Sequence, residues 1–224
     1  MVTIVAALIP GLLGIGLFCL LLFLPAGTFD YWQAWAFIAI FTVITTSPKI
    51  YLAVRRPEVL ARRVRSGPAA KTRPAQKFAS IAYLLLFASI AVISALDHRF
   101  GPSAVPPAVV GVGFVLVALG LGIAMFVVLQ NSYASSTVRV EADQELVSTG
   151  LYRLVRHPMY FGVLTAMAGT PLALGSYSGL VIVVPALATF VFRLQDEEQL
   201  LRAELAGYPE YSDQVRSRLV PLLW

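Results

Sequence analysis

Cysteine and histidine are almost absent from this sequence of 224 residues, which contains one cysteine, Cys19, and two histidines. A single cysteine cannot form a disulfide within the chain, and so few sulfur and imidazole ligands exclude the usual transition-metal sites. Charged residues are also scarce, at 13% of the chain against 58% hydrophobic residues. We therefore expect no metal centre and no nucleic-acid partner.

The hydrophobic residues occur in long blocks, which predicts an all-α membrane protein. A helix needs about 20 apolar residues to cross the hydrocarbon core of a bilayer. Four blocks reach that length, at residues 3–24, 31–54, 78–96 and 105–129. A fifth block, 159–192, is too long for one span and is interrupted at Gly175 and Ser176, which predicts a helical hairpin. The expected fold is a polytopic bundle of about six membrane helices, the last two forming this hairpin.

Basic residues are concentrated in one loop, residues 55–77, which carries eight basic side chains and one acidic side chain. Short loops rich in Lys and Arg stay on the cytoplasmic side of a membrane. This places both termini and the segment 130–158 in the cytoplasm, with the protein in the cell's inner membrane. Because no basic residue precedes the first block, we expect an uncleaved first helix. The loop either fixes this topology by resting on anionic lipid or gathers an acidic lipid substrate.

The chain divides into N-terminal membrane helices, residues 1–129, and a C-terminal catalytic region, residues 130–224. The glycine strings GLLGIG and GVGF lie inside apolar blocks of the first part. Close helix packing is therefore expected of them rather than nucleotide binding. In the second part, an amphipathic helix is expected after the hairpin returns to the cytoplasm at Arg193, followed by a turn at 207–209.

The string GLYRLVRHPMYFG, residues 150–162, is a polar interruption just before the hairpin. A pair of glutamates, Glu197 and Glu198, follows the hairpin and is expected at the same cytoplasmic boundary. Taken alone, the basic cluster would indicate a membrane-surface anchor, and the glutamates could complement a helix dipole. Their occurrence together favours a cytoplasmic site. From the sequence we expect no acid to orient the His157 ring, so a serine or cysteine nucleophile with His157 as its base is poorly supported.

The string LVSTGLYRLVRHPMYFG, followed by DEEQLLRAELAGYPEY, resembles the isoprenylcysteine carboxyl methyltransferase family. These are integral membrane enzymes that methylate lipidated or lipid-like acceptors, and the resemblance covers about residues 130–224. It implies S-adenosylmethionine as the cofactor, with Arg193 and Glu197 as catalytic residues and with Arg193 and Arg156 contacting the substrate. The implied cofactor-binding residues are Gln144, Glu145, Leu146, Val147, Gly150, Tyr152, His157, Pro158, Met159, Tyr160 and Glu198.

The chemistry of methyl transfer suits these residue types. Displacement at a sulfonium needs no metal, and holding the two reactants in line supplies most of the rate. A carboxylate and tyrosine rings favour the sulfonium cation, and an arginine can hold an anionic acceptor. A site at the cytoplasmic rim would be within reach of both a cytosolic donor and a lipophilic acceptor in the bilayer.

Several functions fit this interpretation of the sequence. The first is O-methylation of an isoprenylcysteine-like carboxylate, with a phospholipid amine or a thiol as the alternative acceptor. A membrane sterol-type reductase using NADPH and a non-enzymic membrane scaffold are alternatives of another class. A transporter is disfavoured because the apolar blocks contain almost no ionisable residues.

Overall fold

The computed structural model of the protein describes residues 2–65, 74–101, 103–133, 144–221 and 224. Parts of the basic loop and of the polar connector fall outside these residues. All elements of the described chain are helical, which confirms the all-α class. The long helices are α1 (Val2–Ala26), α2 (Trp32–Arg55), α4 (Pro74–Phe100), α5 (Pro107–Gln130), α6 (Pro158–Ala173) and α7 (Val183–Glu204). The short ones are α3 (Pro57–Arg65), α8 (Tyr208–Gln214) and the 3₁₀ turns η1 (Gly150–Arg153) and η2 (Ser178–Ile182).

Four helical stretches of the described chain are long and apolar enough to cross a membrane. They are Trp32–Arg55, Lys77–Phe100, Pro107–Gln130 and Ser178–Glu204, the last formed by η2 and α7. α1 contributes a shorter apolar stretch, Gly11–Ala26, and α6 has 16 residues. The helices thus have the character of an integral membrane protein, and the total of six spans stays a prediction.

The interruption at Gly175 and Ser176 separates α6 from α7. Gly175 adopts a left-handed φ of 71°, which a residue without a Cβ reaches at no steric cost. The Ser176 amide donates to the Pro171 carbonyl at 2.8 Å and closes the turn. After η2, α7 runs without a break to Glu204, so the amphipathic segment expected beyond Arg193 is the final part of the hairpin's second helix.

α5 and α6 pack backbone against backbone through small residues. A Cβ added to Gly120 would overlap the backbone of Ala166 and Gly162, and one added to Gly162 would lie 2.6 Å from the Gly120 carbonyl. At Gly113, in the string GVGF, an added Cβ would overlap the backbone of Ala173, which confirms close packing there. The same expectation is wrong for the string GLLGIG, because added Cβ atoms at Gly11, Gly14 and Gly16 would have nothing within 4 Å.

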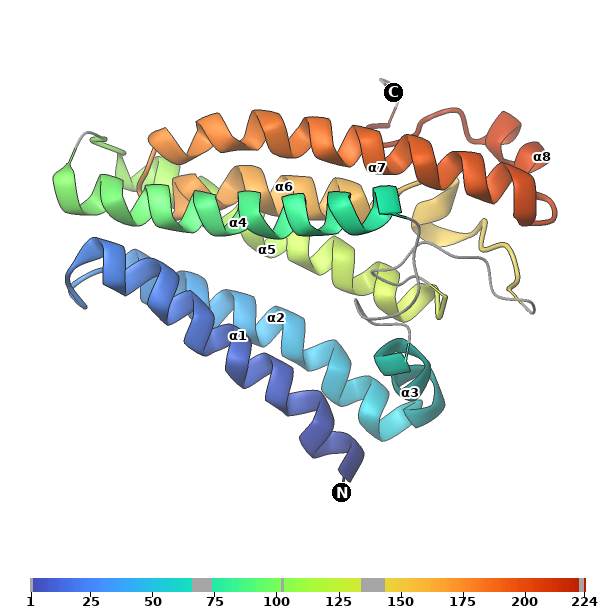
Figure 1. Ribbon diagram of the computed structural model, residues 1–224, viewed down its shortest axis with the longest axis horizontal. Coiled ribbons are helices and arrows are strands. Elements are labelled where there is room, and N and C mark those ends of the chain that lie inside the picture. Colours follow the sequence, from blue (N-terminus) through green and yellow to red (C-terminus); the bar gives the residue numbers. More distant parts are fainter. Residues whose placement is uncertain (1, 66–73, 102, 134–143, 222–223) are drawn as a thin grey trace.

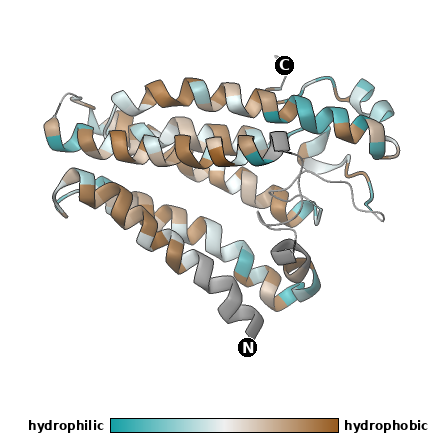
Figure 2. Ribbon diagram, in the orientation of Figure 1, coloured by the Kyte–Doolittle hydropathy of each residue, from teal (hydrophilic) through white to brown (hydrophobic). Residues whose placement is uncertain are grey.

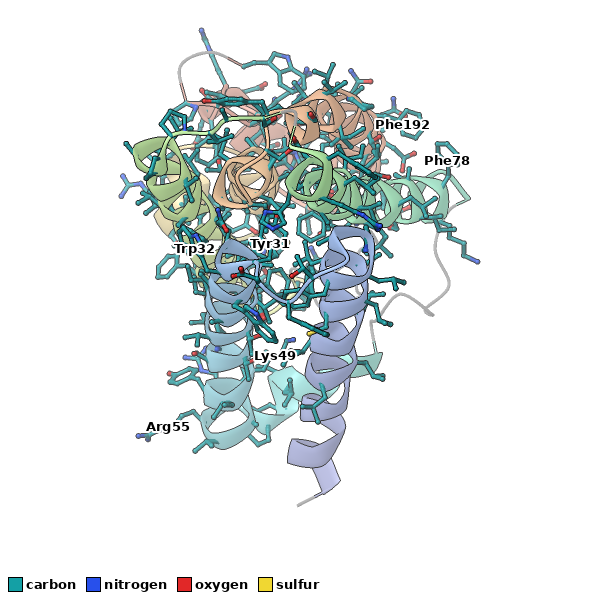
Figure 3. The ribbon with its side chains drawn as sticks, turned by 90° about the vertical axis from the view of Figure 1, so that its left-hand side faces the viewer. Tyr31, Trp32, Lys49, Arg55, Phe78 and Phe192 are labelled. Atoms are coloured by element: carbon teal, nitrogen blue, oxygen red, sulfur yellow. The ribbon has the colours of Figure 1, made fainter. Side chains whose placement is uncertain are left out.

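The helices form two groups (Figure 1). α4, α5, α6 and α7 lie side by side, and the pair α1–α2 packs against α4 and α5. Figure 3 shows this pair leaving the larger group, with Tyr31 at the junction. Tyr31 is 1% exposed, and its hydroxyl donates to the Leu174 carbonyl at 2.7 Å. A hydrogen bond between distant loops therefore fixes the place where the two groups meet.

Hydrophilic residues gather mainly at one end of the bundle. Figure 2 shows hydrophilic residues gathered on the corner between α2 and α3, on the last turns of α7 and on α8. Figure 1 places the N-terminus, α3, η1 and α8 toward this end, which we call the pocket end. The α1–α2 and α6–α7 turns lie at the opposite end, which we call the far end.

Candidate active site

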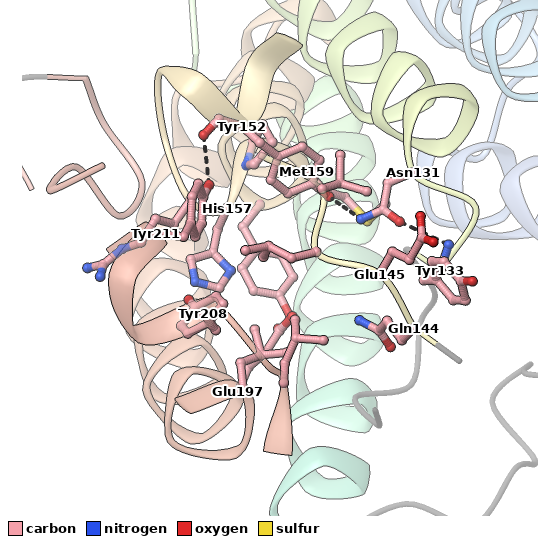
Figure 4. Close-up of a pocket in the computed structure, with 17 residues that line it drawn as sticks. Asn131, Tyr133, Gln144, Glu145, Tyr152, His157, Met159, Glu197, Tyr208 and Tyr211 are labelled. Carbon is pink, nitrogen blue, oxygen red and sulfur yellow. Dashed lines mark hydrogen bonds between the residues drawn. The ribbon is translucent and has the colours of Figure 1, made fainter. Parts of the chain in front are cut away.

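A pocket opens at the pocket end, enclosing about 810 Å³ of space that is partly open to solvent. Figure 4 shows its walls, with His157, Tyr208 and Tyr211 facing Asn131, Glu145 and Gln144 across the cavity. It is lined by Asn131, Tyr133, Gln144, Glu145, Leu146, Val147, Tyr152, Arg156, His157, Pro158, Met159, Tyr160, Glu197, Leu201, Leu205, Tyr208 and Tyr211.

The turn His157–Pro158 forms the start of α6 and one wall of the pocket. Pro158 occupies the first position of the helix, where its missing amide hydrogen costs no hydrogen bond. The amides of Arg156 and His157 instead point to the end of the chain and donate to the carbonyls of Ser217 and Arg218 at 3.0 and 2.9 Å. Main-chain hydrogen bonds to residues near the C-terminus therefore hold the turn in place.

Glu198 lies behind this wall and is 4% exposed. Its Oε1 lies 3.0 Å from Arg156 Nε and 3.3 Å from His157 Nε2, and its Oε2 lies 3.2 Å from Arg218 Nε. A buried carboxylate is tolerated when charged partners surround it in this way. Glu198 therefore couples α7 to the wall residues Arg156 and His157 without lining the pocket itself. The expectation that no acid orients the His157 ring is wrong, because Glu198 comes from α7, 41 residues further along the chain.

Glu197, the neighbouring residue, does line the pocket. Its Oε2 accepts a hydrogen bond from the hydroxyl of Tyr160, which in turn accepts one from Arg193 Nε at 2.8 Å. Arg193 Nη1 also donates to Ser80 Oγ of α4 at 2.8 Å, and its guanidinium carbon lies 5.7 Å from the centroid of the Tyr160 ring. Arg193 is 8% exposed and is not part of the lining. It joins α4 to the pocket through Tyr160.

Tyr152 connects the opposite wall to α8. Its hydroxyl accepts a hydrogen bond from Asn131 Nδ2 at 3.0 Å, and its carbonyl accepts one from the Tyr211 hydroxyl at 2.7 Å. Tyr152 follows Gly150, whose φ of 57° turns the chain into η1. Gly150 is outside the lining, and an added Cβ there would overlap the Gln130 side chain, so its contribution is to the course of the backbone.

One end of the pocket is apolar and includes an unpaired hydroxyl. Leu146 and Leu201 pack with Leu205, Tyr208 and Tyr211 in one hydrophobic cluster. Tyr208 is 3% exposed, and its buried hydroxyl has no hydrogen-bond partner among the described residues. Burial first, and then the negative charge of Glu198, raise the pKa of Tyr208 well above its usual value, so the phenol stays protonated. The Tyr208 hydroxyl can therefore donate a hydrogen bond to an acceptor atom of a bound ligand.

Most of the site residues expected from the sequence meet at this pocket. The exceptions are Gly150, Arg193 and Glu198, which lie behind its walls as described above. The pocket also contains residues that the sequence did not single out for a role: Asn131, Tyr133, Leu201, Leu205, Tyr208 and Tyr211. Tyr208 and Tyr211 belong to the string GYPEY, but their spacing alone is equally typical of aromatic residues at a membrane surface.

The fold and the pocket together define a class of protein: a bundle of apolar helices with the character of a membrane protein and a pocket at one end. Residues 108–206 match the family model described as phospholipid methyltransferase. This family of membrane methyltransferases is related to the isoprenylcysteine carboxyl methyltransferases, so the resemblance given by the motifs is confirmed. The match runs from α5 to the turn before α8 and includes all of the lining except Tyr208 and Tyr211. No curated protein matches the chain.

Proposed function

We propose that the protein transfers the methyl group of S-adenosylmethionine to a lipophilic acceptor in the membrane, with residues 130–224 as its catalytic region. The observation that carries this proposal is the meeting of Glu197, Tyr160, His157 and Tyr152 in one pocket at the end of apolar helices. The family match independently indicates a membrane methyltransferase.

The chemistry of the pocket fits this cofactor. Its sulfonium is a cation, and Glu197 with the rings of Tyr152 and Tyr160 offers a carboxylate and aromatic faces to it. The adenine ring suits the apolar end at Leu146, Leu201 and Leu205, and the unpaired Tyr208 hydroxyl can donate to a cofactor oxygen or nitrogen. In this proposal the ion pairs of Glu198 with Arg156 and His157 hold these two residues in place on the pocket wall.

A phospholipid amine is the acceptor we propose. For such an acceptor, the carboxylate of Glu197 on the pocket wall is suited to attract the headgroup ammonium and to accept its proton, which would free the nitrogen lone pair to take up the methyl group. The description of the matched family supports the same acceptor.

A carboxylate of an isoprenylcysteine-like lipid is the second candidate. Its support is the motif resemblance and Arg193, which lies one hydrogen bond behind Tyr160 and could hold an anion if that hydrogen bond opened. This acceptor needs no general base. The two candidates therefore differ in whether Glu197 or Arg193 limits turnover.

We further propose that the pocket end faces the cytoplasm in the inner membrane, as the basic loop predicts. Arg55, Arg56 and Lys77, at the two ends of that loop, are exposed. This orientation gives the pocket access to cytosolic S-adenosylmethionine.

Calorimetric titration of the purified protein in detergent tests the cofactor assignment. We expect binding of S-adenosylmethionine and of its demethylated product, and no binding of NADPH. Preference for NADPH would favour the reductase alternative, and binding of none of the three would contradict an enzyme that uses either cofactor.

A further inference from the structure

The end of the chain forms part of the site although it lies beyond the segment that matches the family model, residues 108–206. We call residues 215–221 the C-terminal strap. Its carbonyls at Ser217 and Arg218 accept the amides of Arg156 and His157. Leu219, 4% exposed, packs in the same hydrophobic cluster as Tyr160. The strap is thus fixed against the back of the pocket by both polar and apolar contacts.

Arg218 gives the strap a specific electrostatic role. Its Nε lies 3.2 Å from Oε2 of Glu198, the oxygen that faces away from the ion pairs with Arg156 and His157. The Arg218 guanidinium carbon lies 5.2 Å from the centroid of the Trp224 ring, and the Trp224 carbonyl accepts the Leu219 amide at 2.8 Å. The guanidinium therefore has a defined place although its side chain is 35% exposed.

We propose that Arg218 is a positioning residue of the cofactor site, holding the Glu198 carboxylate in the orientation that sets Arg156 and His157 on the pocket wall. This inference rests on the proposed function. A buried carboxylate that loses one charged partner turns toward others or admits water. Without Arg218, Oε2 of Glu198 lacks that partner, and the two wall residues on Oε1 lose their fixed geometry.

The cofactor affinity of three variants tests this role. We expect Arg218→Gln to weaken binding of S-adenosylmethionine by about tenfold, because one partner of a largely buried ion pair is lost. Arg218→Lys keeps the charge and should recover most of that loss. The control is Arg216→Gln, which removes the same charge from an exposed residue of the strap and should leave affinity unchanged. Equal affinity for Arg218→Gln and the wild type would overturn the inference.

A double-mutant cycle with Glu198→Gln separates positioning from general stabilisation of the fold. If Arg218 acts through the Glu198 charge, Arg218→Gln should cause little further loss of affinity in the Glu198→Gln background. The same loss in both backgrounds would show that Arg218 acts by another route and would contradict the proposal.

Histidine spectra test the positioning without any cofactor. The chain has two histidines, His98 and His157, so ¹⁵N-histidine labelling gives two sets of ring signals. We expect Arg218→Gln to shift the His157 signals and to leave those of His98, which stacks on Tyr31 at the far end, unchanged. An unchanged His157 signal would overturn the role of Arg218. Failure of the wild type to bind S-adenosylmethionine would overturn the proposed function alone.

Discussion

At the residue scale, Glu197 and Glu198 are adjacent in sequence and occupy different environments. Glu198 is enclosed by Arg156, His157 and Arg218, so its charge is balanced inside the protein. Glu197 is partly exposed and lines the pocket, where its carboxylate accepts a hydrogen bond from the neutral hydroxyl of Tyr160. Its charge is therefore the one positioned to act on a ligand.

We predict that Glu197→Gln weakens binding of S-adenosylmethionine by about tenfold to a hundredfold, since a nearby opposite charge in partly screened surroundings contributes a few kcal/mol. The demethylated product lacks the sulfonium charge, so its affinity should change much less. Calorimetry with both ligands measures the difference.

Glu204→Gln is the matched control, because Glu204 is exposed on the same helix and outside the lining. It should leave both affinities unchanged. An equal loss for donor and product in Glu197→Gln would mean that the carboxylate does not recognise the sulfonium.

At the scale of elements, the contact between α5 and α6 sets the geometry of the pocket. Asn131 directly follows α5, His157 directly precedes α6, and both residues line the pocket. Their spacing depends on the small residues between the two helices, above all Gly120 and Gly162.

We predict that Gly120→Ala destabilises the protein by about 2 kcal/mol, because the added methyl group overlaps the backbone of α6. Thermal unfolding in detergent measures this loss. Gly122→Ala, two residues along the same helix, has nothing within 4 Å of the added Cβ and should be neutral or slightly stabilising. Equal melting temperatures for the two variants would contradict the close contact.

At the scale of the whole molecule, a buried acid joins segments that are far apart in sequence. Asp97, at the far end, is 4% exposed. Its carboxylate accepts hydrogen bonds from Ser103 on the loop after α4 and from Ser176 and Ser178 on the α6–α7 turn. This cluster therefore ties the hairpin to α4.

We predict that Asp97→Asn lowers the free energy of unfolding by about 2 kcal/mol, because an amide cannot accept all of these hydrogen bonds and leaves buried donors unpaired. Its melting temperature, measured in detergent, should fall. Asp30→Asn changes an exposed acid and should have no such effect. A stable Asp97→Asn variant would show that the cluster contributes little.

Much of the architecture follows from the sequence, because a bilayer-length apolar block has few alternatives to a helix. Gly175 forms the turn of the hairpin because it tolerates a positive φ, and Pro158 begins α6 because its missing amide hydrogen costs nothing there. Asp97 lies just beyond the apolar block 78–96, whereas α4 continues to Phe100 and buries it. Its partner Ser176 lies 79 residues away, so local sequence gives no sign of the contact.

The site was predictable in its location but not in all of its detail. The motifs predicted which residues meet at one pocket. They could not show which of Glu197 and Glu198 faces it, because the rotation of α7 about its axis decides that. That rotation is set by Phe190 and Leu194 packing against the neighbouring helices. Asn131 and Tyr211 belong to the pocket through hydrogen bonds to Tyr152, 21 and 59 residues away in sequence, which no local pattern reveals.

The most direct test of the central claim uses methyl-labelled S-adenosylmethionine and vesicles containing the purified protein. One set of vesicles contains a phospholipid with a primary amine, and a second contains a prenylated cysteine instead. We predict label in the amine lipid, abolished in Glu197→Gln. Label only in the prenylated cysteine would transfer the assignment to the carboxylate acceptor, and no label in either lipid by a protein that binds the donor would contradict transfer to these acceptors.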